Sequence, residues 1–100
     1  MLHTVNKSPF EKTTFDSCLN HARPGDAILL IEDGVYAAVK GTAVAERVAA
    51  LNGDLSIYAL GPDLSARGIK DTSLIERISV VDYGGFVDLV AEHDVSQAWL

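Results

Sequence analysis

Apolar residues along the chain gather into five short runs, which we predict to be strands. They cover Met1 to Val5, Ala27 to Ile31, Leu55 to Leu60, Ile78 to Val81 and Ser96 to Leu100. A strand with one face in water alternates apolar and polar positions, whereas a strand covered on both faces is apolar throughout. Because Ala27 to Ile31 and Ile78 to Val81 are almost continuously apolar, the pattern predicts parallel strands between two layers of helices.

The stretches between these runs have the spacing of amphipathic helices. We expect a helix from about Thr13 to His21, with Phe15, Leu19 and Ala22 on its buried stripe, and a last helix that carries Phe86, Val87, Leu89 and Val90. Shorter helical pieces are expected around Ala43 to Leu51, which follows the stretch Val35 to Val39, and from Leu64 to Arg67. This alternation predicts one α/β domain over residues 1–100, with three layers and a mainly parallel five-stranded sheet flanked by helices.

An aspartate follows three of the predicted strands, as Asp33, Asp63 and Asp82. In a parallel α/β sheet these turns lie at the carboxyl edge, where ligands usually bind, so the three side chains could form a carboxylate cluster for acid–base chemistry. Aspartate is also among the preferred residues for capping the start of a helix. Since no motif pairs two of these carboxylates, we favour the interpretation as helix caps.

Composition narrows the class of protein. The chain is 48% hydrophobic and 22% charged, which excludes an intrinsically disordered segment. No uninterrupted apolar stretch exceeds five residues, far short of the roughly 20 that span a bilayer. The N-terminus lacks the pattern of a signal peptide, and the chain has a single cysteine. We therefore expect a cytoplasmic protein without a membrane segment.

Charge and motifs exclude further classes of function. Fourteen acidic and eight basic residues give a net charge of -6, and the basic residues are scattered, which argues against direct binding to nucleic acid. The glycine-rich motifs of dinucleotide and phosphate sites and the serine elbow of hydrolases are absent. His3, His21 and His93 share no metal-ligand spacing with Cys18. We expect neither a cofactor nor a metal.

Cys18 is the remaining candidate for chemistry. On an ideal helix it lies about 60° from Phe15 and about 100° from Leu19, which places it at the margin of the buried stripe, within reach of a partner. His21 follows at i+3, where its ring could stabilise a thiolate. The alternative interpretation, which local features favour, makes Cys18 a small core residue and His21 a solvated surface residue.

Five blocks of sequence, in order, extend over essentially the whole chain. They are MLHTVNKSPF (1–10), IEDGVYAA (31–38), GPDLSARG (61–68), VVDYGGFVDL (80–89) and QAWL (97–100). Together they resemble the DsrH/TusB family. The resemblance implies a DsrE/F/H-like fold with flavodoxin-like layering, and a subunit of a cytoplasmic sulfurtransferase complex that acts as a sulfur relay.

The resemblance also implies partners. Such subunits form a heterohexamer with DsrE/TusD-like and DsrF/TusC-like subunits, two copies of each. The complex passes persulfide sulfur to a DsrC/TusE-type carrier. No cofactor, membrane or direct nucleic-acid contact is implied for this chain.

Cys18 matches the cysteine that is typical of DsrH-type members and that many TusB-type members lack. The match makes Cys18 a candidate persulfide carrier, with His21 as a weaker candidate for stabilising its thiolate, and favours the DsrH branch, which serves sulfur oxidation. The alternative is a TusB-type subunit of the relay for 2-thiolation of the tRNA wobble uridine, with a structural role. A third hypothesis is a stand-alone protein that binds a small ligand at the carboxyl edge of the sheet.

Overall fold

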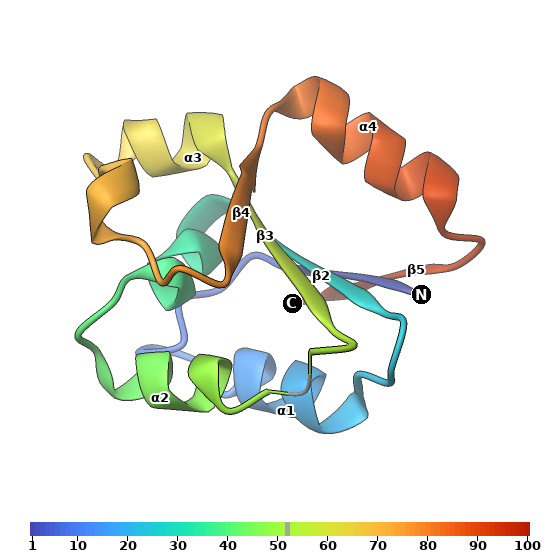
Figure 1. Cartoon of the computed structure of the whole chain (residues 1–100), viewed down its shortest axis with the longest axis horizontal. Helices are drawn as coiled ribbons and strands as arrows, with labels where there is room; N and C mark the ends of the chain where they lie inside the picture. The colour runs from blue at the N-terminus through green and yellow to red at the C-terminus, as the bar shows by residue number, and fades with distance from the viewer. Residues whose placement is uncertain (52) are drawn as a thin grey trace.

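Five parallel strands form the central sheet (Figure 1). In this computed structural model, which describes residues 1–51 and 53–100, they are β1 (Leu2–Val5), β2 (Ala27–Leu30), β3 (Ser56–Leu60), β4 (Ile78–Val81) and β5 (Ser96–Trp99). Their order across the sheet is β4-β3-β2-β1-β5, and every neighbouring pair is parallel. The predicted five-stranded parallel sheet is confirmed.

Helices lie on both faces of this sheet (Figure 1). They are α1 (Thr14–His21), α2 (Ala43–Ala49), α3 (Gly61–Ala66), α4 (Tyr83–Glu92) and the 3-10 helices η1 (Glu32–Ala38) and η2 (Asp71–Ser73). The pair α1 and α2 covers one face, where an ion pair between Asp16 and Arg47 links them, and α4 covers the other. None of the helices in the described residues has the length and apolarity needed to cross a bilayer.

The two faces of the sheet bury very different numbers of apolar residues. The larger cluster, on the face of α1 and α2, contains sixteen buried residues, including Val5, Ile28 and Leu30. The smaller cluster, beneath α4, contains four, namely Leu2, Ala27, Leu29 and Leu89. Alternate side chains of β1 and β2 thus enter opposite layers.

The prediction of two covered faces holds for β2 and fails for β4. All four residues of β2 are buried, because this strand lies in the middle of the sheet. In β4 only Ile78 is buried, while Ser79 and Val80 are exposed. The reason is position, since β4 forms one edge of the sheet and the helical layers reach it only in part.

A close contact at the carboxyl edge sets the path of the chain after β2. A Cβ atom at Gly34 would overlap the carbonyl oxygen of Val5, so only glycine lets η1 lie directly against the end of β1. Two residues before Gly34, at the start of η1, Glu32 has a left-handed backbone with φ 49°, which is unfavourable for a residue with a side chain. Its N–H donates to the Asp63 carboxylate at 2.7 Å, which holds this conformation.

Candidate functional site

Cys18 lies in the core. The apolar residues Phe15, Cys18 and Leu19 have helical spacing on α1 and form its buried side. Cys18 itself is 0% exposed, so the prediction that it lies at a reachable margin is wrong. The angles on an ideal helix describe α1 alone and leave out the elements that pack on it. In the structure α1 packs over both β1 and β5, and Trp99 of β5 packs against the larger apolar cluster, which contains Cys18. The buried side of α1 is therefore wider than its own apolar stripe.

Burial determines the chemistry of this thiol. It raises the pKa of Cys18 to about 12, and the negative charge of Asp26 adds to the effect. Near neutral pH the group is a protonated thiol, with a thiolate fraction roughly a thousandfold below that of an ordinary cysteine. Nucleophilic attack and sulfur transfer both require the thiolate. In this structure Cys18 therefore has the properties of an inert core residue.

His21 faces other partners than the thiol. Its Nδ1–H donates to the Ser17 carbonyl oxygen at 2.9 Å, within the last turn of α1. Its ring lies beside that of Trp99, with centroids 5.3 Å apart. Within residues 1–51 and 53–100, no hydrogen bond or ion pair joins His21 to Cys18. The structure does not bring the two predicted site residues together as a thiolate and its stabilising group.

The sequence interpretation missed the role of His3, which is 2% exposed on β1. Trp99 Nε1–H is only a donor, so His3 Nδ1 accepts it, at 3.0 Å. The ring proton then lies on Nε2 and is donated to Asp26 Oδ2 at 2.9 Å. A histidine inside an apolar strand is the signal that could have revealed this network, because a buried polar side chain requires partners.

Asp26 extends the network to the N-terminus. Its carboxylate accepts hydrogen bonds from His3, from the backbone N–H of Arg23 at 3.0 Å and from the amino group of Met1 at 3.0 Å. Burial alone would raise the pKa of this carboxyl, but the three hydrogen bonds and the positive amino group outweigh it and hold the pKa well below its usual range.

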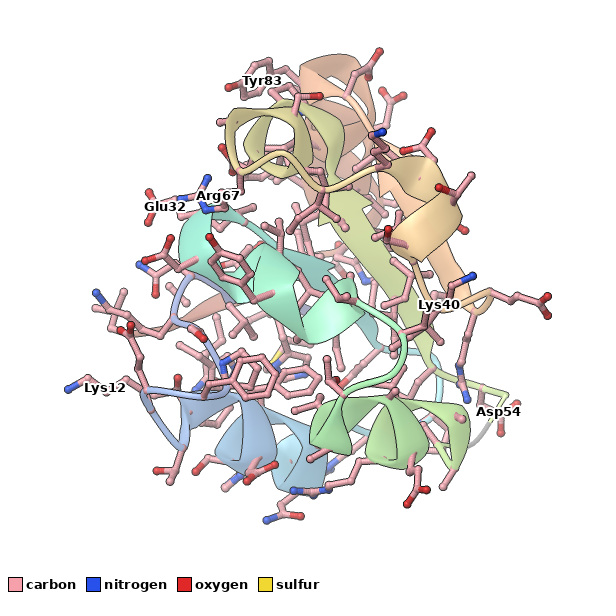
Figure 2. All side chains as sticks on the ribbon, turned by 90° about the vertical axis from the view of Figure 1, so that its left-hand side faces the viewer. Lys12, Glu32, Lys40, Asp54, Arg67 and Tyr83 are labelled. Carbon is pink, nitrogen blue, oxygen red and sulfur yellow. The ribbon has the colours of Figure 1, made fainter. Side chains whose placement is uncertain are left out.

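The three aspartates at the carboxyl edge divide into one cap and two tertiary contacts. Asp82 caps α4, accepting the N–H of Gly85 at 2.8 Å, as predicted. The cap prediction is wrong for the other two: Asp63 accepts the N–H of Glu32, and Asp33 accepts Arg67 Nε at 3.0 Å. Figure 2 shows Glu32 and Arg67 at the same edge of the molecule. These side chains join the segments that follow β2 and β3.

Metal ligation has no candidate in the part of the chain that the structure describes. Residues 1–51 and 53–100 contain no group of three or more His, Cys, Asp or Glu side chains that could hold an ion.

Both a family model and individual relatives match this chain over most of its sequence. A family model described as "DsrH like protein" matches residues 7–96. A protein named TusB from Escherichia coli strain K12 is 39% identical over 99 residues, covering 99% of this chain and 100% of the relative. A protein of the same name from Pectobacterium parmentieri is 36% identical over the same length and coverage.

Solved structures share the fold at lower sequence identity. The ychN protein of E. coli has a TM-score of 0.81 at 13% identity, with 97% of each chain covered. Protein Tm0979 of Thermotoga maritima has a TM-score of 0.68 at 22% identity, with 94% of this chain and 95% of that chain covered.

The burial of Cys18 predicts slow reaction with a thiol reagent. At pH 8 the folded protein should react with an aromatic disulfide reagent more slowly, by on the order of a thousandfold or more, than the same protein unfolded in urea, because burial holds the thiol protonated and the reagent reaches the sulfur only when the core opens. Stopped-flow absorbance measures both rates on the same sample. Comparable rates in the two states would show that the thiol is exposed.

The Asp26 network predicts a loss of stability in acid. A carboxyl with a lowered pKa in the folded state stabilises the fold above its unfolded pKa, about 3.9, and this stabilisation is lost as the pH falls below that value. The free energy of unfolding, from urea titrations between pH 6 and pH 3, should fall more steeply for the wild type than for Asp26→Asn. Parallel curves would refute the role of the carboxylate.

Proposed function

The chain belongs to the DsrH/TusB family, and from this premise we propose that it is the TusB-type subunit of a sulfur relay for 2-thiolation of the tRNA wobble uridine. In this proposal it contributes structure and binding surface to the complex, and cysteines of other subunits carry the sulfur. The full-length similarity to proteins named TusB supports the branch.

The burial of Cys18 is the observation that carries the structural role. In a persulfide relay, the acceptor thiolate attacks the outer sulfur of the donor persulfide, a new S–S bond forms, and the donor leaves as a thiolate. The acceptor must therefore be ionised and reachable by a second protein. Cys18 is 0% exposed and its pKa is raised to about 12, so it meets neither condition in the fold described here.

A second candidate function is the DsrH-branch role in sulfur oxidation, with Cys18 as the persulfide carrier. One sequence observation favours it, the match of Cys18 to the cysteine typical of DsrH-type members. For this role α1 would have to expose a side chain that packs in the larger apolar cluster. Burying such a side chain is worth on the order of 1 kcal/mol or more, so exposing it has a corresponding cost.

The proposed partners are TusC-like and TusD-like subunits, two copies of each with two of this chain, and a TusE-type carrier that receives the sulfur. The net charge of -6 supports contact with proteins over contact with RNA. We place the complex in the cytoplasm, where tRNA is modified, and assign contact with the tRNA to a downstream enzyme.

The test is the 2-thiouridine content of tRNA in a strain that lacks this gene, measured by nucleoside mass spectrometry. We expect the modified nucleoside to fall by at least tenfold in the deletion strain, and plasmid copies of the wild type and of Cys18→Ala to restore it equally. Thermal unfolding of the purified variant serves as the folding control.

Two results would contradict the proposal in different ways. Unchanged 2-thiouridine in the deletion strain would refute a role in tRNA thiolation. Restoration by the wild type but not by a folded Cys18→Ala protein would show that the thiol is required, and would favour the carrier role.

A further inference from the structure

Helix α4 is apolar over far more of its surface than its contact with the sheet requires. At about 100° per residue, the apolar side chains from Leu89 through Phe86, Val90, Tyr83 and Val87 to Ala91 cover an arc of about 200°. A surface helix that packs on one core needs a stripe of roughly 100°. The remaining half of this arc has no partner among the described residues.

Exposure identifies this outer half. Leu89 is 5% exposed and packs with Leu2 and Leu29, and Phe86 is partly buried against the same cluster. By contrast, Tyr83 is 61%, Val87 66% and Val90 45% exposed. These three, with Phe86 and Ala91, line a shallow groove, and we call this surface the outer face of α4. An apolar surface of this kind, rimmed by polar residues, marks an interaction site.

The location of this face separates it from Cys18. Tyr83 lies at the far end of the molecule from α1 and α2 (Figure 2). The helix α4 covers the opposite face of the sheet from α1 (Figure 1). A substitution on the outer face of α4 therefore leaves the surroundings of Cys18 intact.

The charges around the outer face determine which partner fits it. From Ile78 to the C-terminus the chain has four acidic residues and no lysine or arginine. Asp88 and Glu92, which follow the apolar arc on the same helix, are exposed. A two-fold contact between two copies would place these carboxylates near their counterparts, with like-charge repulsion and no lysine or arginine from this segment to offset it. The rim therefore disfavours a second copy and favours a partner with lysine or arginine around an apolar centre.

We propose that the outer face of α4 docks a protein subunit of different sequence, whose contact surface is apolar at its centre and basic at its rim. This inference rests on the proposed function, in which such a subunit is one of the two sister subunits of the relay. The apolar centre supplies the attraction, since the exposed valines and the tyrosine leave water on binding. The acidic rim supplies orientation and selects against self-association.

The test is co-expression of this chain with the TusC-like and TusD-like subunits of the same organism, followed by affinity capture and light scattering. Val87→Asp and the pair Asp88→Lys with Glu92→Lys address the centre and the rim. Phe10→Ser is the matched control, because Phe10 is an exposed apolar residue, 57% exposed, outside α4. Substitutions at exposed positions such as these leave stability almost unchanged, and thermal unfolding checks this.

We expect the wild type and Phe10→Ser to recover the complex, and both α4 variants to recover at least tenfold less. The wild-type chain alone should be a monomer in light scattering. Equal recovery with all variants, or equal loss with Phe10→Ser, would overturn the docking surface while leaving the proposed function in place. A dimer of the chain alone that Val87→Asp abolishes would assign the face to a second copy and overturn the proposal. Failure of the wild type to recover either sister subunit would refute the proposed function, and this inference with it.

Discussion

A histidine buried in an apolar core needs a partner for each ring nitrogen, and His3 finds its two partners in distant parts of the chain. Trp99 donates to one nitrogen from the last strand, and Asp26 accepts from the other just before β2. Leaving one of these groups unpaired would cost about 1–3 kcal/mol. The network thus holds β5 against β1 and ties the amino group of Met1 to the same point.

The burial of Cys18 depends on this arrangement. Strand β5 lies at the edge of the sheet and pairs with β1, and α1 packs across both. Trp99 lies against the larger cluster, which contains Cys18, and its ring also contacts His21. The pairing of His3 therefore holds Trp99 against the cluster that encloses the thiol, and burial in this cluster raises the pKa of the thiol. A carrier role would require part of this packing to open.

The opposite face of the sheet, beneath α4, has a much smaller core. Four buried residues hold α4 to it, compared with sixteen in the other cluster. Helix α4 leaves Tyr83, Val87 and Val90 exposed to water, and an exposed apolar patch of this kind is typical of an interaction surface. Family membership makes Cys18 a candidate for sulfur chemistry, but in the structure its thiol is buried while the apolar outer face of α4 is exposed. This contrast supports a subunit that works through assembly.

The pattern of apolar residues predicted the fold well, because it indicates both the strands and the helices. The continuous apolar run at Ala27 to Ile31 indicated a central parallel strand, and the helical spacing of Phe15 and Leu19 located α1 to within a residue. The site could not be predicted in the same way, since it depends on tertiary neighbours. The enclosure of Cys18 comes from β1 and β5, and Asp33 and Asp63 bind groups more than thirty residues away in place of their own helix ends.

The most direct test of a structural role for this chain is the intact mass of each subunit in the reconstituted complex after incubation with a persulfide-charged sulfur donor. With such a role, this chain keeps its unmodified mass while a sister subunit gains one sulfur atom that a reductant removes. A gain of one sulfur atom on this chain, absent in Cys18→Ala, would contradict it.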